Sequence, residues 1–395
     1  MREMKDSGVE WIGEVPVNWE IVPIKADVSI GHGSDPVSPG DIPVWGSGSE
    51  PFKTCGEHKN GPVVLLGRKG TLDCPQLVTG LYWNVDTAFD AKVTTKKISL
   101  KYFYYAATCV DIKPYMTNTA KPSMTQFDWG NSRIPRPPLS EQRRIVAYLD
   151  ELCAVIDEDV AKRREVIEKL KEYKKSLITR AVTKGLDPNA EMKDSGVEWI
   201  GEVPADWRLT KIGQVYDLRN KKVSDYDFEP LSVTMQGIVP QLDNAAKTDA
   251  HDDRKLVMKG DFVINSRSDR RGSCGIAKQN GSVSLINTVL IPQDSMNPRF
   301  YDWLFHTSLF ADEFYKNGHG LVDDLWTTKW TEMKGITIVE PPLEAQAAIA
   351  DYLDERCAAI NEAISRQEQL IEKLGEYRKS IIHHVVTGKI DCSEA

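Results

Sequence analysis

A tandem repeat constrains this chain more than any other feature of its sequence. Residues 4–19 read MKDSGVEWIGEVPVNW and residues 192–207 read MKDSGVEWIGEVPADW, so the two stretches agree at 14 of 16 positions at an offset of 188. No hydrophobic periodicity forces this match, because tryptophan, glycine and proline are mixed without a regular spacing. The identity indicates that both copies keep the same contacts, and we expect both to meet the same kind of partner surface.

A second, longer repeat follows each copy of the first. It begins with PPLSEQRRIVAYLDELCAVID at Pro137 and with PPLEAQAAIADYLDERCAAIN at Pro341, and it aligns without gaps to Asp187 and Asp391 at an offset of 204. About half of its positions agree, whereas the segments between the repeats have diverged almost beyond recognition. Slow divergence of amphipathic helices would explain this second match, but not the first.

The longer repeat predicts two unusually long helices. Residues 139–183 contain neither proline nor glycine, Ser140 is a candidate N-cap, and Gly185 followed by Pro188 supplies a stop. A helix of about 45 residues is roughly 65 Å long.

A heptad stripe predicts that each helix has one helical partner. The stripe runs from Cys153 to Ala181 and, in the same register, from Cys357 to Val385. A bundle core would show a similar stripe. Because each helix leaves one variable segment and ends near the other module, we expect an antiparallel coiled coil that returns the C-terminus towards the N-terminus. The predicted fold class is α+β: two mixed α/β domains separated by a long two-helix coiled coil, as a pseudo-twofold tandem repeat.

Composition narrows the function classes less than the repeats do. The net charge is −8, but residues 20–136 carry 13 Lys and Arg against 11 Asp and Glu, and residues 208–340 carry 17 against 18. The charge therefore neither supports nor excludes nucleic-acid binding. No apolar run approaches the ~20 residues of a membrane span and the first residues are charged, which predicts a cytoplasmic protein without a membrane partner. Seven scattered cysteines without a C-x-x-C pair predict reduced thiols and no zinc site.

Several motifs together resemble the specificity subunit of type I restriction-modification systems. They are the repeated opening MKDSGVEWIGEVP with Trp19 or Trp207, the P-P-L-x-x-Q helix entries at Pro137 and Pro341, and the runs IPVWGSGS at 42–49, VVLLGRKGT at 63–71 and VINSRSDRRGSCGIA at 263–277. The resemblance covers the whole chain.

The resemblance implies two target recognition domains, each reading one half of a split sequence in double-stranded DNA. Their connecting helices dock two methyltransferase subunits, and restriction and translocase subunits join that core. On this chain it places the first domain at 1–136, the first spacer helix at 137–187, the second domain at 188–340, and the second spacer helix with the C-terminus at 341–395.

Basic and polar loops supply candidate DNA contacts, since cations meet phosphates and guanine edges and side-chain amides suit adenine. In the first domain the candidates are Arg68, Lys69, Thr71, Asn118, Thr119, Lys121, Ser123 and Gln126. In the second they are Arg267, Ser268, Arg270, Arg271, Ser273, His319 and Lys329, and this set contains the densest basic cluster of either variable segment. A salt-bridged hairpin and a plain surface loop are the alternatives for the first-domain set.

Candidate partner contacts come from the parts that repeat. They are Trp11 and Trp199 in the short motif, and the polar residues Arg163, Lys174, Gln367 and Arg378 at matching steps of the two heptad stripes.

No catalytic motif accompanies these features. A DNA methyltransferase needs an Asn or Asp before Pro-Pro-aromatic, whereas Arg136 and Glu340 precede the two Pro-Pro pairs and leucine follows them. Residues 67–71 lack the spacing of a nucleotide-binding loop. We therefore expect a non-catalytic chain without cofactor or metal. The alternatives are a standalone methyltransferase or nuclease with unrecognised chemistry, and a coiled-coil scaffold without DNA selectivity.

Overall fold

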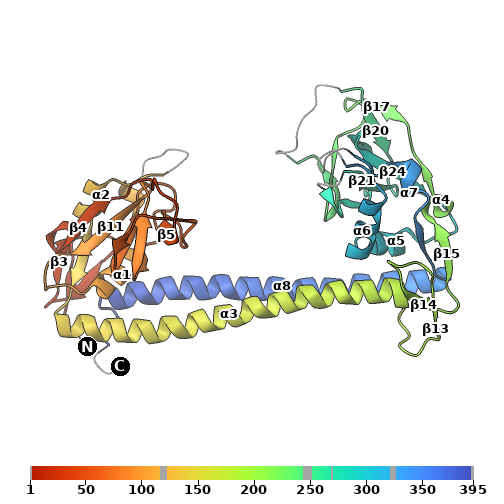
Figure 1. Ribbon diagram of the computed structural model, residues 1–395. Helices are drawn as coiled ribbons and strands as arrows, with labels where there is room; N and C mark the ends of the chain where they lie inside the picture. Colours follow the sequence, from red (N-terminus) through yellow and green to blue (C-terminus); the bar gives the residue numbers. More distant parts are fainter. Residues whose placement is uncertain (1, 116–121, 243–250, 268–269, 321–325, 393–395) are drawn as a thin grey trace. The chain divides into compact units, whose positions relative to one another are not determined.

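The computed structural model describes residues 2–115, 122–242, 251–267, 270–320 and 326–392. It divides into two compact units, one of residues 1–164 and 368–395 and the other of residues 165–367. Each unit contains a mixed α/β domain and a stretch of both long helices (Figure 1). The predicted α+β tandem architecture with a two-helix coiled coil is thereby confirmed.

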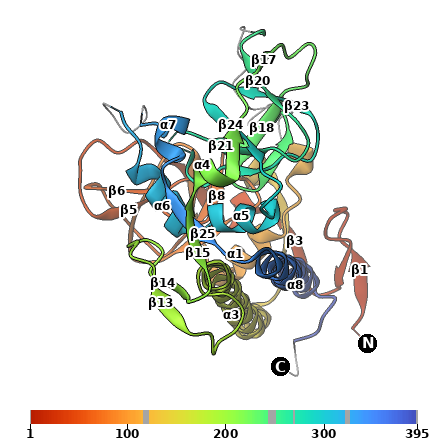
Figure 2. The ribbon, with the colours of Figure 1, turned by 90° about the vertical axis from the view of Figure 1, so that its right-hand side faces the viewer.

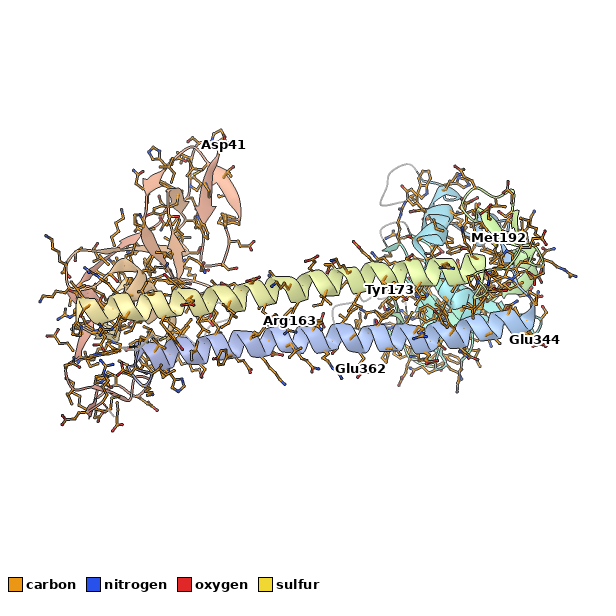
Figure 3. The ribbon with its side chains drawn as sticks, turned by 90° about the horizontal axis from the view of Figure 1, so that it is seen from below. Asp41, Arg163, Tyr173, Met192, Glu344 and Glu362 are labelled. Carbon is orange, nitrogen blue, oxygen red and sulfur yellow. The ribbon has the colours of Figure 1, made fainter. Side chains whose placement is uncertain are left out.

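The long helices are α3, Leu139–Lys184, and α8, Leu343–Val386. They lie side by side and antiparallel in each unit (Figures 1 and 2): Arg378 donates to Asp157 (2.6 Å) in the first, and Lys174 donates to Asn361 (2.8 Å) in the second. Every position of the predicted heptad stripe is buried or half-buried, while most side chains between them point to solvent (Figure 3). The stripe is therefore the seam of the coiled coil.

Of the two predicted ends of the first long helix, only the C-terminal one is correct. Gly185 follows the last helical residue with a φ of 72° and its N–H bonds to Ala181, a left-handed helix end that glycine favours. Ser140 is not the N-cap, because α3 already begins at Leu139 and the N–H groups of Glu141 and Gln142 bond to the carbonyl of Pro138.

The two domains share a frame that the sequence did not reveal. Each has an antiparallel four-stranded sheet of the same order, β4-β11-β8-β9 in the first and β16-β24-β21-β22 in the second. The first sheet is formed by Val28–His32, Ala88–Val93, Val63–Gly67 and Gln76–Val78, and the second by Tyr216–Leu218, Asn287–Pro292, Phe262–Asn265 and Cys274–Ile276. Helices α1, Leu100–Thr108, and α5, Pro298–Phe305, pack their aromatic side chains into the two cores.

A two-stranded ribbon in each domain leads into its long helix. It is β3, Glu20–Pro23, with β12, Arg133–Arg136, and β15, Arg208–Lys211, with β25, Thr337–Glu340. A short helix precedes its second strand, α2 at Gln126–Asn131 and α7 at Trp330–Met333. The cross-strand pair next to the long helix is reversed in charge, Glu20 with Arg136 in one copy and Arg208 with Glu340 in the other.

Outside this frame the domains differ. The first adds η1, Ile24–Ala26, η2, Lys113–Tyr115, and the sheet β6-β5-β10-β7, formed by Lys53–Cys55, Ile42–Trp45, Leu81–Asn84 and Lys59–Asn60. The second adds α4, Ile212–Val215, α6, Ser308–Lys316, the pair β18-β19, Leu231–Thr234 and Gly237–Pro240, and the sheet β17-β20-β23, formed by Lys222–Val223, Arg254–Val257 and Gly281–Ser284. The divergence of sequence is thus a divergence of structure around one shared frame.

Each copy of the short motif is a hairpin that packs on the end of a long helix. The first is β1, Met4–Asp6, with β2, Glu14–Pro16, and the second is β13, Met192–Asp194, with β14, Glu202–Pro204, in the same register. The first shares a core with the C-terminal residues of α8, and the second with those of α3. The predicted return of the C-terminus to the N-terminal module is confirmed, since Arg2 pairs with Asp391 (3.8 Å).

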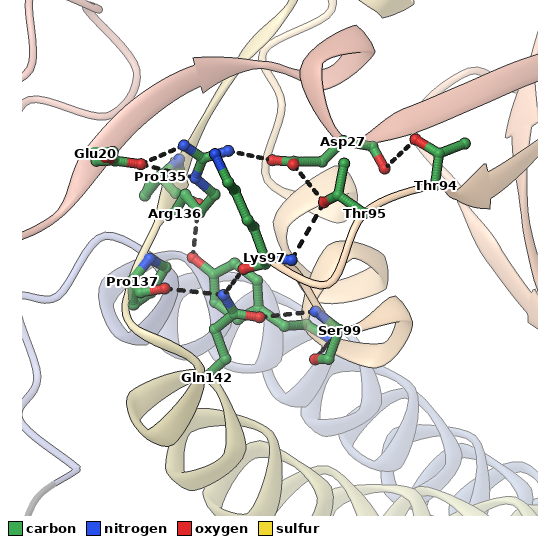
Figure 4. Close-up of polar contacts among 11 residues, drawn as sticks. Glu20, Asp27, Thr94, Thr95, Lys97, Ser99, Pro135, Arg136, Pro137 and Gln142 are labelled. Carbon is green, nitrogen blue, oxygen red and sulfur yellow. Dashed lines mark hydrogen bonds and ion pairs between the residues drawn. The ribbon is translucent and has the colours of Figure 1, made fainter.

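A buried glutamine in the P-P-L-x-x-Q motif fixes each domain to its helix. Gln142 is fully buried; its Oε1 accepts from the N–H of Ser99 (2.8 Å) and its Nε2 donates to the carbonyls of Lys97 and Pro137 (both 2.8 Å) (Figure 4). Gln346 repeats this, accepting from the N–H of Asn297 and donating to the carbonyl of Pro341 (both 2.8 Å). The repeated glutamine therefore couples the start of α1 or α5 to the following long helix.

Two charged anchors reinforce the same joint. Arg136 donates to Glu20 (2.9 Å) and to buried Asp27 (2.6 Å), and its hydrogen bond lowers the pKa of the Glu20 carboxyl (Figure 4). About two helical turns beyond Gln142, Asp150 accepts from Lys101 (2.6 Å) and from the hydroxyl of Tyr105 (2.7 Å). The matching Asp354 accepts from Arg299 (2.6 Å) and Trp303 (2.9 Å), so domain and helix are held together in the same way twice.

Candidate nucleic-acid interface

Three loops of the first domain meet beyond the end of β8. Lys69 pairs with Ser123 through an isolated backbone bridge, the N–H of Gly70 donates to Pro122 (2.9 Å), and that of Met124 donates to Arg68 (3.0 Å). The hydroxyl of Ser47, from the IPVWGSGS run, donates to the carbonyl of Lys69 (2.7 Å). Two loops that the sequence predicted separately are thus one surface.

The two cations of this surface differ in how strongly they are held. Arg68 is half-buried and donates to both the carbonyl (3.0 Å) and the carboxylate (3.2 Å) of Asp86, which matches the alternative of a salt-bridged hairpin. Lys69 is exposed and lies 3.5 Å from the same carboxylate, and Thr71 is exposed as well. Lys69 is therefore the more accessible cation of the pair.

The remaining first-domain candidates are placed unevenly. Gln126 begins α2, where its Nε2 donates to the carbonyl of Ile30 (2.5 Å) and its Oε1 lies 3.0 Å from His32 Nε2, so both ends of its amide are engaged within the domain. Asn118, Thr119 and Lys121 lie outside the described residues.

The second domain builds the equivalent surface from different residues. Arg267, beyond the end of β21, forms a backbone bridge to Thr327, and the N–H of Thr328 donates to Ser266 (2.9 Å). These contacts correspond to Lys69 with Ser123 and to Met124 with Arg68. His319 is also bridged to Thr327, and exposed Lys329 stands directly before α7. The basic loop and its predicted polar counterpart are thus adjacent here too.

Arg271 is held by a ring and a carboxylate from another part of the domain. Its guanidinium lies 3.8 Å from the ring centroid of Tyr315 and donates to Asp312 (2.9 Å). Trp326 in turn lies with its ring 5.6 Å from Tyr315 and donates to that residue's carbonyl (2.9 Å). Within the described part of the chain, stacking on Tyr315 and one carboxylate contact orient Arg271 and leave part of its donor set for a ligand.

The other second-domain candidates fall into three groups. Arg270 is exposed in the turn where its N–H bonds to Arg267 (3.3 Å). Ser273 is 4% exposed and its carbonyl accepts from Asn265 (2.9 Å), so it supports the loop from inside. Ser268 lies outside the described residues.

Sequence reasoning missed several residues that shape this surface. Asp312, Tyr315 and Trp326 position Arg271, but they follow it by 41 to 55 residues and no spacing in the sequence links them. Glu332 lies 4.0 Å from His319, and its carboxyl has a lowered pKa, mainly through the hydrogen bond from Thr331, with the charge of His319 adding to it. Ser47 belongs to the IPVWGSGS motif, but the motif does not reveal that its hydroxyl bonds to Lys69.

The candidate partner residues make contacts within the chain. Trp11 is half-buried and its carbonyl accepts from His383 (2.7 Å); Trp199 is half-buried with its ring 6.1 Å from Phe310. Arg163 donates to Asp159 (3.2 Å), Lys174 and Arg378 bond across the seam as described above, and Gln367 is half-buried in it. Whether they also meet a partner stays a prediction.

The described part of the chain contains no set of three or more His, Cys, Asp or Glu that could hold a metal ion. All seven cysteines are free, and burial raises the pKa of Cys109 to about 12. Nor does any described helix have the length and apolar character that a bilayer span requires.

Comparison with known proteins finds several similar chains. No protein-family model matches the chain. It is 24% identical over 360 residues to the type I restriction enzyme MjaVIII specificity subunit of Methanocaldococcus jannaschii, an alignment that covers 85% of this chain and 77% of that protein. It is 25% identical over 276 residues to the putative type I restriction enzyme MjaX specificity subunit of the same organism, covering 68% and 61%.

A solved structure from work on complex assembly and conformational transition of the type I R-M system has the same fold. It matches with a TM-score of 0.67 at 18% identity, covering 95% of this chain and 99% of that one. The chain therefore belongs with two-domain, helix-linked proteins of this architecture. More particularly, the predicted resemblance is confirmed: the chain is homologous to the specificity subunits of type I restriction enzymes.

Proposed function

We propose that this chain is the DNA-sequence specificity subunit of a type I restriction-modification complex. Each domain reads one half of a bipartite target in double-stranded DNA. The long helices and repeated hairpins dock two methyltransferase subunits, and restriction subunits join through that core. The chain itself is non-catalytic, takes no cofactor and works in the cytoplasm.

One observation carries this proposal: the same place on two matching sheets bears a cationic loop bridged to a polar loop, built from different residues. Lys69 with Ser123 and Arg267 with Thr327 occupy equivalent backbone positions. Phosphate contacts need only positive charge at a fixed place, whereas base readout depends on the individual side chains. A shared frame with unlike surface residues therefore supports two readers of different sequences.

The repeated parts support the docking of identical partners. The hairpins keep the same register and 14 of 16 residues, and the two glutamine joints make matching bonds. Two equivalent surfaces on one chain are suited to two copies of one partner.

Lengthening both long helices is expected to change the spacing of the target. Seven residues inserted after Arg163 and seven in α8 after Gln367 preserve the heptad register and add about 10 Å of helix, or roughly three base pairs. We expect the permitted spacer between half-sites to lengthen while both halves are still read. Binding of the reconstituted complex to DNA with spacers of graded length measures this. The control is a variant in which heptad residues are substituted without lengthening the helices. An unchanged spacer preference in the insertion variant would show that the helices do not set the spacer length.

Two assays separate this function from its alternatives. Purified chain is incubated with S-adenosylmethionine and DNA; methyl transfer without a partner subunit would show chemistry of its own. The chain with methyltransferase subunits is then footprinted on mixed-sequence DNA. We expect protection at a bipartite sequence, whereas a scaffold without DNA selectivity would leave no sequence-dependent footprint.

A further inference from the structure

The two hairpin sites differ at one buried tryptophan. In the first unit Trp19 is 1% exposed and its Nε1 donates to the carboxylate of Glu141 (2.8 Å). Glu141 also pairs with Arg2, whose guanidinium lies 5.6 Å from the Trp19 ring centroid and 3.8 Å from Asp391. Two side chains of this chain thus fill the space beside the indole.

The second unit lacks both of those side chains. The offset of 188 places Ala190 at the position of Arg2, and the N–H of Ala205 bonds to Glu191 as that of Val17 bonds to Glu3. The offset of 204 places Ala345 at the position of Glu141, next to the matching glutamine. The ion pair that closes the first site is therefore replaced by two methyl groups.

A groove of about 490 Å³ lies where the ion pair would stand. It is lined by the end of α3 and the loop after it, by the end of β14 and the residues after it, and by the first turns of α8. Asp187, Ala190, Glu191, Trp207 and Ala345 belong to this lining. It lies wholly within the second unit.

Trp207 indicates which hydrogen-bonding group a ligand in the groove must supply. The residue is 3% exposed, and no hydrogen-bond acceptor for its Nε1 is found in the described part of the chain, whereas Trp19 has the Glu141 carboxylate. Because Trp207 lines the groove, a ligand bound there can bring an acceptor to this unpaired donor. Asp187, which corresponds to Asp391, and Glu191 line the groove as well, so a cation beside that acceptor would be paired as Arg2 is in the first unit.

We propose that this groove receives a peptide segment of a partner protein, with an acceptor directed to Trp207 Nε1 and a cationic side chain directed to Asp187 and Glu191. The partner is the methyltransferase subunit, so the inference rests on the proposed function. Because Arg2 and Glu141 already occupy the matching site of the first unit, only one of the two docked subunits gains this contact. The two sites are inequivalent, and the one at the second unit is tighter.

Closing the groove with the chain's own ion pair tests this directly. The variant Ala190→Arg/Ala345→Glu transplants the pair that the first unit accommodates, and we expect its thermal unfolding temperature to be unchanged or higher. Purified methyltransferase subunit is titrated into the full chain and followed by calorimetry and native mass spectrometry. For the unaltered chain we expect two sites that differ by about tenfold or more in Kd, and for the variant two equal sites at the weaker value.

The control Ala190→Ser/Ala345→Ser keeps the groove open and should retain two unequal sites. Two equal sites in the unaltered chain, or an unequal pair that survives closure, overturn the inference while leaving the proposed function standing. Absence of any binding of the methyltransferase subunit overturns both. A second readout does not depend on the double variant: a thiol placed by Ala345→Cys should react with a maleimide at least tenfold more slowly once the partner is bound, and an unchanged rate contradicts the occupant.

Discussion

Replacing Arg270 and Arg271 by alanine is expected to weaken recognition of one half of the target by about tenfold to a hundredfold, since a good contact to a base edge contributes roughly 1 to 3 kcal/mol of discrimination. The other half should be read as before. Arg271 is directed by Tyr315 (3.8 Å to the ring centroid) and Asp312 (2.9 Å), so little ordering is left to the moment of binding. The measurement is the Kd of the reconstituted complex for DNA in which one half-site at a time is scrambled.

Lys222→Ala is the matched control for this variant. Lys222 is an exposed cation of the same domain, paired with Asp253 (2.5 Å), and it lies on β17, outside the shared sheet. Its loss should change the affinity for either half-site by less than about fivefold, because an exposed ion pair contributes about 1 kcal/mol or less. Unchanged half-site recognition in the double arginine variant would exclude this loop as a reader.

Replacing Gln142 by alanine is expected to destabilise the first unit by about 2 to 4 kcal/mol, because a buried N–H and two carbonyls lose their partner at once. The side chain is fully buried and its three hydrogen bonds are all 2.8 Å long. The thermal unfolding temperature, measured by circular dichroism, should fall by roughly 5 to 15 °C. Gln346→Ala should act similarly on the second unit, through its bonds to Asn297 and Pro341.

Arg143→Ala provides the comparison, since Arg143 is the next residue of α3 and is exposed. Its effect should stay within about 0.5 kcal/mol, as for most surface substitutions. If Gln142→Ala proved as stable as Arg143→Ala, the joint between domain and helix would have to be attributed to Arg136 and Asp150 instead.

The repeats carried most of what could be predicted about the fold. Absence of proline and glycine from 139 to 183, with glycine at 185, was enough to place α3, because helix length and termination depend on local sequence. Ser140 has a side chain suited to capping, but it does not mark the start of the helix, because the chain turns helical directly after Pro138.

The frame shared by the two domains could not be predicted. Strands β8 and β21 each pair with a strand, β11 or β24, that begins more than 20 residues later, and strand pairing over such distances leaves no local signal. The equivalence of Lys69 and Arg267 appears only once the backbone bridges to Ser123 and Thr327 are known. The same holds for Arg271, whose orientation depends on Tyr315 in another element.

The repeated glutamine shows the reverse case, in which a sequence signal was visible before its cause. The spacing P-P-L-x-x-Q could be recognised as a motif, yet only the structure explains it: the glutamine side chain reaches back to the carbonyl of the first proline and across to the start of α1 or α5. A motif that joins two elements in this way stays constant while the loops around it diverge.

The most direct test of two-half recognition is a map of methylated bases in a genome where this chain is expressed with its methyltransferase subunit. We expect a bipartite motif, two short specified halves separated by a fixed number of unspecified bases, with both halves methylated. Deleting the chain should abolish this motif. A single contiguous motif, or a bipartite motif that persists without the chain, would contradict the claim that its two domains each read one half of the target.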